Sequence, residues 1–178
     1  MRKIDWNSVT ETKAFSHPVP GAYIVKIAGV EDIEEKEYLT ISWDYIDGDL
    51  VGYNVYTYDR WGWWPCQIRR SYKPTALGFF KAFKTAVEKS NPGFAFREDD
   101  LDAMCGKKIG VVLGEEEYVS SSGETKTRLY VYSVVPVDDV KEGRAQIPPV
   151  KRITKATEQK IDIPVQLEEI NDDEPMPF

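Results

Sequence analysis

EYLTISWDYI, residues 37–46, is the stretch of sequence that decides the fold. Apolar side chains stand at every second position from Leu39 to Tyr45, and the positions between them, from Thr40 to Asp44, are polar. This alternation indicates a strand with one buried face. The Asp47-Gly48 pair that follows is a strong hairpin signal. We therefore expect a third strand directly after it, over LVGYNVYTYD, residues 50–59.

Four further elements surround this predicted pair of strands. GAYIVKIAGVEDI, residues 21–33, is rich in β-branched and aromatic residues, which is typical of a strand. Residues 74–91 carry apolar side chains at steps of three and four, which predicts a helix. Residues 107–119 and 126–137 alternate, and the SSSGET turn between them predicts a hairpin.

The order of elements, three strands, one helix and two strands, predicts an all-β domain with one helix. Two architectures have this order: a five-stranded Greek-key barrel of the oligonucleotide/oligosaccharide-binding (OB) type, and an open α+β sandwich. We expect the OB-fold domain to span residues 1–139. Residues 140–178 show little periodicity, repeated prolines and rising acidity, which predicts a flexible acidic tail that interacts with proteins.

The charge of the chain is unevenly distributed. The net charge is −7, but residues 158–178 alone hold seven acidic residues and one basic residue. Residues 60–91 hold seven basic residues against the single acid Glu88. The pattern predicts a basic face on the domain and an acidic tail behind it.

Several classes of protein are disfavoured by the composition. No apolar run approaches the roughly 20 residues that span a bilayer, and no secretory signal is recognisable at the N-terminus. Cys66 and Cys105 form no CxxC pair, and His17 is the only histidine. We therefore expect no metal site, no cofactor, no catalytic residue and no enzyme activity, and a cytoplasmic location. Asp47 and Asp49 flank a turn glycine, where turn chemistry accounts for them.

RWGWWPCQIRRSYK, residues 60–73, combines rings and cations in one short segment. Aromatic rings stack on exposed bases and cations contact phosphates, so this mixture is typical of a single-stranded nucleic-acid site. A cluster that plugs the end of a barrel, with arginines pointing outward, is the first alternative. A carbohydrate module is the second, although neutral sugars do not need four cations. The predicted binding residues are Arg60, Trp61, Trp63, Trp64, Arg69, Arg70, Tyr72 and Lys73, together with Tyr56 and Tyr58 on one face of the expected third strand.

The chain ends in NDDEPMPF, an acidic run followed by an apolar tip. Acidic tails are commonly solubility devices. An apolar tip behind an acidic run also suits docking into a partner's apolar pocket with a basic rim. The predicted partner-binding residues are Asp172, Asp173, Glu174, Met176, Pro177 and Phe178.

This ending resembles the acidic tip of bacterial and phage single-stranded-DNA-binding proteins, which end in an Asp run, an apolar residue and Pro-Phe. Glu174 stands where the family has an Asp, and Pro175 is an addition to the pattern. The body, through LVGYNVYTYDRW, ALGFFKAF and CGKKIGVVLGEEEY, is similar to small Gram-positive phage proteins of the same role.

The resemblance implies an OB-fold protein that coats single-stranded DNA without sequence preference in the cytoplasm of a bacterial host. It also implies that the tip recruits replication, recombination and repair proteins. An OB-fold binder that prefers RNA, and an adaptor that binds protein but no nucleic acid, stay open as alternatives. The sequence leaves the oligomeric state open, and a homo-oligomer is compatible with it.

Overall fold

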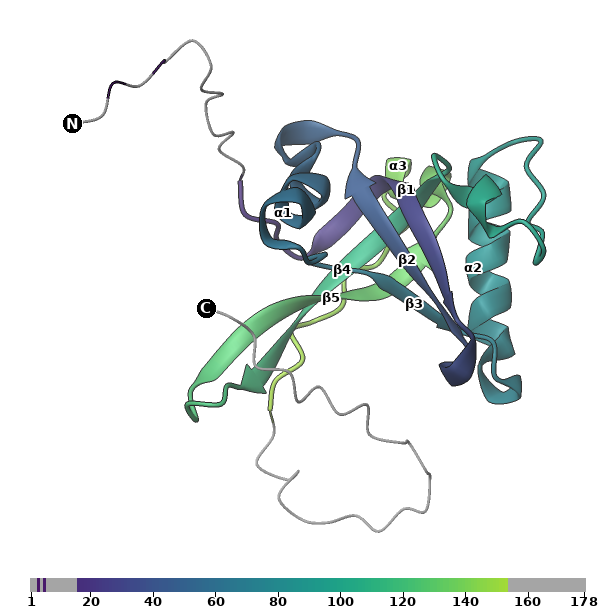
Figure 1. Cartoon of the computed structure of the whole chain (residues 1–178). Coiled ribbons are helices and arrows are strands. Elements are labelled where there is room, and N and C mark those ends of the chain that lie inside the picture. Colours follow the sequence, from purple (N-terminus) through teal and green to yellow (C-terminus); the bar gives the residue numbers. More distant parts are fainter. Residues whose placement is uncertain (1–2, 4, 6–15, 154–178) are drawn as a thin grey trace.

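A single antiparallel sheet of five strands, in the order β3-β2-β1-β4-β5, organises the protein (Figure 1). The computed structural model describes residues 3, 5 and 16–153 of the 178-residue chain. Helix α1 lies on one side of the sheet and helix α2 on the other. The bounds of the strands are β1 (Gly21–Ile33), β2 (Tyr38–Tyr45), β3 (Ile68–Ser71), β4 (Lys108–Val119) and β5 (Thr125–Val135), and those of the helices are α1 (Tyr53–Trp61), α2 (Leu77–Ser90) and α3 (Val137–Lys141).

The alternation in β2 places its apolar side chains in the core, as predicted. Leu39, Ile41, Trp43 and Tyr45 are all buried, and Trp43 is completely enclosed. The rings of Trp43 and Tyr45 meet edge to face with their centroids 5.1 Å apart. The predicted strands β1, β4 and β5 and the helix α2 are confirmed as well. The alternation of apolar and polar residues along the strands therefore determines which face of the sheet is buried.

The expected third strand, residues 50–59, is wrong, because this region forms α1 instead. Gly48–Leu50 is a 3-10 turn rather than a hairpin turn, and Gly52, with a φ of 83°, turns the chain into the helix. The third strand is β3, which lies inside the basic and aromatic segment. A tertiary contact favours the helix over the expected strand. The carboxylate of Asp44 accepts a hydrogen bond of 3.0 Å from the backbone N–H of Asn54 in the first turn of α1.

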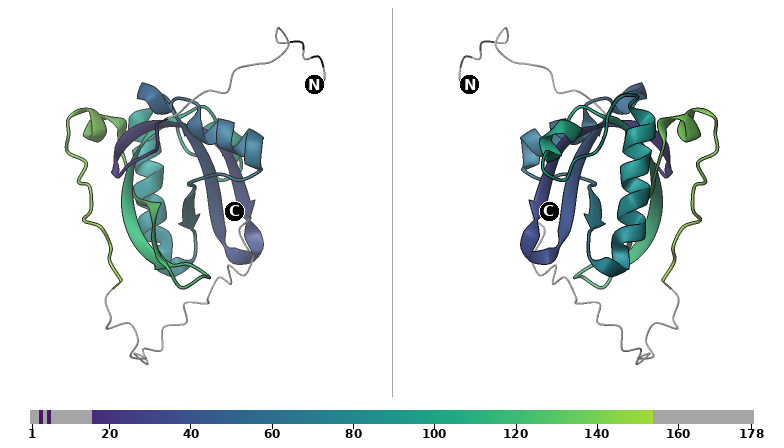
Figure 2. Two further views of the ribbon diagram at one scale, coloured as in Figure 1. Left: turned by 90° about the vertical axis from the view of Figure 1, so that its left-hand side faces the viewer. Right: turned by 90° about the vertical axis from the view of Figure 1, so that its right-hand side faces the viewer.

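The two edge strands of the sheet, β3 and β5, face each other across α2. Among the described residues no strand pairing joins β3 to β5, so the sheet is open. Helix α2 contacts β3, β4 and β5 and lies in the opening (Figure 2). Further along the opening, the thiol of Cys66 lies against the backbone of Val131 in β5. Side chains rather than a strand ladder therefore fill the gap between the two edges.

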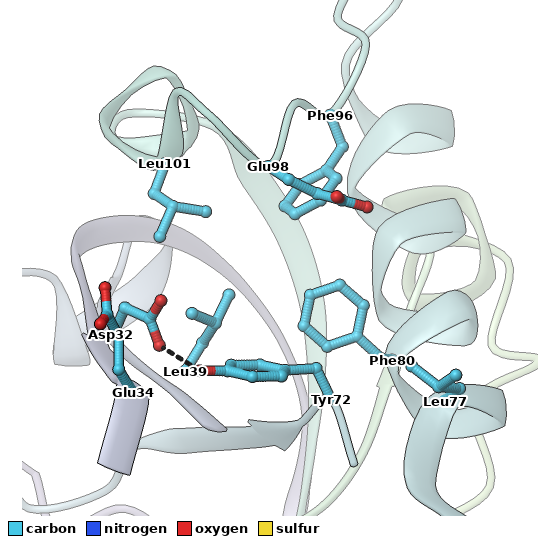
Figure 3. Close-up of a pocket in the computed structure, with 9 residues that line it drawn as sticks. All are labelled: Asp32, Glu34, Leu39, Tyr72, Leu77, Phe80, Phe96, Glu98 and Leu101. Atoms are coloured by element: carbon cyan, nitrogen blue, oxygen red, sulfur yellow. Dashed lines mark hydrogen bonds between the residues drawn. The ribbon is translucent and has the colours of Figure 1, made fainter. Parts of the chain in front are cut away.

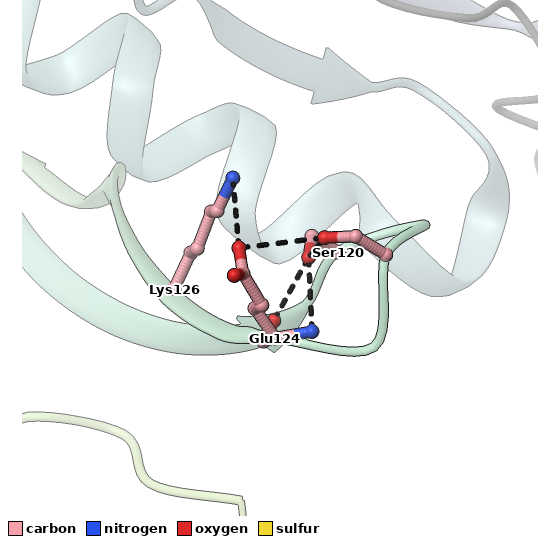
Figure 4. A network of polar contacts seen from close by, with 4 residues as sticks. Ser120, Glu124 and Lys126 are labelled. Carbon is pink, nitrogen blue, oxygen red and sulfur yellow. Dashed lines mark hydrogen bonds and ion pairs between the residues drawn. The ribbon is translucent and has the colours of Figure 1, made fainter.

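The hairpin between β4 and β5 is closed by a compact polar turn (Figure 4). The backbone N–H of Ser120 donates to the carbonyl of Glu124 at 2.8 Å, and the Ser120 hydroxyl accepts from the N–H of Glu124 at 3.2 Å. Lys126 forms an ion pair of 3.6 Å with the Glu124 carboxylate. The serine-rich sequence thus satisfies the turn's backbone groups locally.

The segment after α3 returns along the sheet up to the last described residues. The expected tail begins at residue 140, but residues 142–153 lie within the described structure, and Lys151 bridges to β4. Its N–H donates to the carbonyl of Glu115, and its carbonyl accepts from the N–H of Glu117, each at 2.9 Å. This part of the expected tail therefore packs against β4, at residues beyond the end of its pairing with β1.

Gly110 in β4 lies close to residues of α3 and β5. A Cβ atom on this glycine would lie 2.6 Å from Cγ2 of Val140 and 2.9 Å from the carbonyl oxygen of Val135. We expect Gly110→Ala to lower the free energy of unfolding by about 1–3 kcal/mol, because the added methyl group overpacks a filled space. Urea denaturation measures the change.

The matched control for this substitution is Gly29→Ala in β1. Gly29 has an ordinary φ and no atom within 4 Å of an added Cβ. Removing a glycine at an unstrained position restricts the unfolded chain, so we expect unchanged or slightly increased stability. Equal losses in the two variants would contradict the close approach of α3 to β4.

Candidate nucleic-acid interface

The inner side of α1 is polar. Asn54 and Thr57, at helical spacing, are the buried residues of this helix. The amide Nδ2 of Asn54 donates to the carbonyl of Trp43 at 2.9 Å, and the hydroxyl of Thr57 donates to the carbonyl of Tyr53 at 2.8 Å. The bond from Asn54 holds the helix to β2, whereas the bond from Thr57 is made within the helix, on the side that amphipathic helices normally fill with apolar groups.

The outer side of α1 carries a stripe of apolar residues. Val55, Tyr58 and Trp61 follow one another at a spacing of three and are 38%, 44% and 62% exposed. Trp63, just beyond the helix, is 51% exposed. Large aromatic residues gathered on a surface indicate an interaction site rather than ordinary surface composition.

Two contacts involve the rings at the end of α1. Tyr58 stacks on Trp64 with centroids 4.9 Å apart and planes 18° from parallel. The guanidinium carbon of Arg60 lies 5.3 Å from the centroid of the Trp61 ring, which is a cation–π contact. Gly62, with a φ of 74°, ends the helix, and its N–H donates to the carbonyl of Tyr58 at 2.7 Å. We call Tyr58, Arg60, Trp61, Trp63 and Trp64 the aromatic platform.

A polar and basic strip of sheet follows the platform in the chain. Residues 65–67 lead from the platform into β3, where Arg69 is exposed and pairs with Thr40 of β2 on the face turned away from the core. On the same face, Gln67 donates a hydrogen bond of 3.0 Å to the hydroxyl of Ser42. Small polar side chains and one arginine therefore stand beside the platform.

Arg70 has a different environment from its neighbour, because successive side chains in a strand point to opposite faces. Its guanidinium carbon lies 5.9 Å from the centroid of the Phe83 ring in α2, and it donates a hydrogen bond of 2.8 Å to the carbonyl of Arg69. Burial lowers the pKa of Arg70. This arginine is turned toward α2 rather than toward the outer face.

The remaining predicted residues are distributed around the platform and away from it. Tyr56 and Tyr58 lie on a helix, so they point about 200° apart and do not share a face as expected for a strand. The hydroxyl of Tyr72 donates to the carboxylate of Asp32 at 3.0 Å, at the opposite end of β3 from Trp64. Lys73 is exposed just before α2. The predicted tip, residues 172–178, lies outside the described residues.

Two exposed apolar residues were missed by sequence reasoning. Val55 was expected inside the third strand, although the spacing of residues 55, 58 and 61 is a helical signal on the outer face. Phe79 was placed in the helix but is 76% exposed near the start of α2. No pattern in the sequence distinguishes Phe79 from the buried Phe83 of the same helix.

Other types of site receive little support from the described part of the chain. Over residues 16–153, no group of three or more histidine, cysteine, aspartate or glutamate residues is arranged to hold a metal ion. No helix in the described ranges is long and apolar enough to cross a membrane. No protein-family model matches the chain, and no curated protein matches it. The resemblance of the tail and body therefore rests on the residues quoted for it.

Proposed function

We propose that the protein binds single-stranded DNA, without sequence preference, through the aromatic platform and the exposed Arg69. The observation that carries this proposal is the orientation of α1, which buries Asn54 and Thr57 and leaves Tyr58 and Trp61 exposed to solvent. A helix that served only the core would be oriented the other way.

The chemistry of the platform supports a single strand as the ligand. Unpaired bases offer flat faces to Trp61, Trp63 and the stacked Tyr58–Trp64 pair, and each stacked base contributes about 1–3 kcal/mol. Arg60 and Arg69 are exposed, which supports a role in contacting phosphates. In a duplex the base faces are stacked on each other, so we expect double-stranded DNA to bind much more weakly.

We further propose that the protein is an OB-type barrel. In this barrel the packing of side chains, rather than pairing of β3 with β5, closes the open sheet. The position of α2 between the two edge strands and the contact of Cys66 with β5 support this reading. OB barrels are partly open, and they use one sheet face and its bordering loops to bind oligonucleotides. The outer face of β2 and β3, next to the platform, is the corresponding surface here.

The experiment is a titration of the intrinsic tryptophan fluorescence with an oligo-dT strand at 50 mM and 200 mM salt. We expect strong quenching by the single strand and little by a duplex of equal length. With two phosphate contacts, at Arg60 and Arg69, the affinity should fall about sevenfold between these salt concentrations. Absence of both quenching and a gel shift would contradict the proposed function.

The two alternatives make different predictions in the same assay. An OB-fold binder that prefers RNA releases labelled oligo-dT more readily to an oligo-U competitor than to unlabelled oligo-dT. An adaptor without nucleic-acid affinity gives no signal with either strand. The exposed Val55 beside the rings favours the adaptor as the second candidate, because an aliphatic side chain contributes little to base stacking.

The proposed function extends to the tail through the family resemblance. We propose that residues 172–178 recruit replication and recombination proteins to the coated strand in the cytoplasm of a bacterial host. The match of the acidic run and the Pro-Phe ending to the family pattern supports this part of the proposal.

A further inference from the structure

A second concave site lies away from the aromatic platform, on the side of the sheet that α2 covers (Figure 3). It is a cavity of about 560 Å³ between the end of β1, the end of β3, the start of α2 and the segment before β4. This volume lies within the range of ligand pockets in proteins. The lining residues are Asp32, Glu34, Leu39, Tyr72, Leu77, Phe80, Phe96, Glu98 and Leu101.

The floor of this cavity is apolar. Leu39 belongs to the buried core, and the rings of Phe80 and Phe96 meet edge to face with centroids 5.7 Å apart. Leu101 packs against the same core, while Leu77 at the mouth is 49% exposed. The cavity thus presents a formed apolar surface to solvent. Covering this surface with another apolar group lowers the free energy of the system.

The rim of the cavity is acidic. Asp32 and Glu34 lie together near the hydroxyl of Tyr72, and Glu98 lies apart from them beside Phe96 (Figure 3). Asp32 accepts the hydroxyl hydrogen bond of Tyr72 at 3.0 Å. No lysine, arginine or histidine is among the lining residues in the described ranges.

Two basic residues adjoin lining residues in the sequence, Lys73 beside Tyr72 and Arg97 beside Glu98, and neither of them lines the cavity. Arg97, next to Glu98, is held by the carboxylate of Asp99 through two hydrogen bonds, from Nε at 3.0 Å and from a terminal nitrogen at 2.8 Å. The three carboxylates of the rim therefore face the cavity with no cation of the lining to balance them.

We propose that this cavity is a docking site for a peptide segment of another protein that carries an apolar side chain flanked by basic residues. The apolar side chain enters the floor, and the flanking cations pair with the rim. Burial of the apolar group supplies the affinity, whereas complementary charge at a hydrated rim mainly supplies specificity and a faster encounter.

The negative charge of the rim argues against two other ligands for this cavity. Phosphates of nucleic acid are repelled by three carboxylates, so this cavity does not extend the proposed DNA interface. The chain's own residues 158–178, with seven acidic residues and one basic residue, are repelled for the same reason. A partner of opposite charge is the occupant that the rim selects.

The test uses the full chain and a fluorescein-labelled hexapeptide with a leucine–tryptophan pair between two lysine pairs. Fluorescence anisotropy should show saturable binding. A peptide with glutamates in place of the lysines should bind at least tenfold more weakly. A peptide with serines in place of the leucine–tryptophan pair should also lose at least tenfold.

Variants of the protein locate the binding to this cavity. Glu34→Lys/Glu98→Lys should weaken binding of the lysine peptide at least tenfold, since both side chains are exposed and line the rim. Glu35→Lys is the matched control, because Glu35 is equally exposed and adjacent but does not line the cavity. It should change the affinity less than threefold, and thermal melting verifies that all variants remain folded.

Three results would overturn the proposal. Equal binding of the lysine and glutamate peptides means that charge plays no part. Equal loss in Glu35→Lys and the double variant places the peptide elsewhere. Concentration-dependent dimers that Glu34→Lys/Glu98→Lys abolishes assign the cavity to a second copy of the chain. None of these readouts depends on DNA, so failure here is distinct from failure of the proposed function.

Discussion

Replacing Trp61 and Trp63 together by alanine is expected to weaken binding of oligo-dT at least about 30-fold. Both rings are more than half exposed, so their removal takes little from the core. Each is expected to support one stacked base, which contributes about 1–3 kcal/mol. Loss of both contacts therefore costs at least about 2 kcal/mol, which corresponds to about 30-fold in the dissociation constant.

The measurement is a competition gel shift, since the substitutions remove part of the fluorescence signal. Phe79→Ala is the matched control, because Phe79 is an aromatic residue on α2, outside the platform, and is more exposed than either tryptophan. It should leave the affinity within twofold. Trp61→Phe/Trp63→Phe should keep most of the binding, since a phenyl ring still stacks. A similar loss in Phe79→Ala would mean that exposed rings bind DNA regardless of position.

Most of the sheet could be predicted because its strands obey a simple period. In β2 the core face is uniformly apolar from Leu39 to Tyr45, so the alternation identifies both the strand and its inner side. Helix α2 was predicted for the same reason, with Phe83 and Val87 on its buried face. These elements are ones whose local pattern agrees with the tertiary structure.

Helix α1 could not be predicted because its local pattern opposes its tertiary role. The hairpin signal of Asp47-Gly48 made residues 50–59 look like a third strand. The structure instead buries Asn54 and Thr57, whose hydrogen-bond partners lie in other parts of the chain or in the helix backbone. Sequence-level reasoning is expected to fail where function overrides packing.

The site was predicted as one segment, but the fold divides that segment. Trp61 and Trp63 are exposed at the end of α1, whereas Tyr72 contacts Asp32 at the far end of β3. Arg69 and Arg70 point to opposite faces of β3. Recognition of β3 in the sequence would have separated these two arginines, but a four-residue strand gives too short an alternation to identify.

Asp44 is the residue that attaches α1 to the sheet, and Asp44→Ala is expected to lower the free energy of unfolding by about 2–4 kcal/mol. Its Oδ1 atom accepts from the backbone N–H of Asn54 at 3.0 Å and of Tyr45 at 2.9 Å. The first N–H groups of a helix need acceptors, and the residue before α1, Gly52, has no side chain to provide one. Alanine would leave buried donors unpaired, each at a cost of about 1–3 kcal/mol.

Urea denaturation measures this loss, with Asp47→Ala as the matched control. Asp47 is an exposed aspartate at the same turn, with no side-chain hydrogen bond to cap the 3-10 turn that follows it. Its replacement should change the stability by no more than about 0.5 kcal/mol. Equal effects of the two substitutions would mean that Asp44 contributes only general surface charge and does not hold α1.

The same carboxylate predicts a pH dependence whose sign distinguishes its charge from its hydrogen bonds. Burial raises the pKa of Asp44, against the opposing effect of the hydrogen bonds from Asn54, Tyr45 and Val55. A folded-state pKa above the unfolded value favours the protonated acid in the fold. This stabilisation is complete below the ordinary aspartate pKa of about 3.9 and is lost as the pH rises through the folded pKa.

Asp44→Asn keeps an acceptor oxygen and removes the charge, so the stability of the unmodified protein should fall relative to this variant as the pH rises above about 4. Urea denaturation of both proteins between pH 3 and pH 8 measures the difference, and parallel curves would show that the ionisation of Asp44 is not coupled to folding.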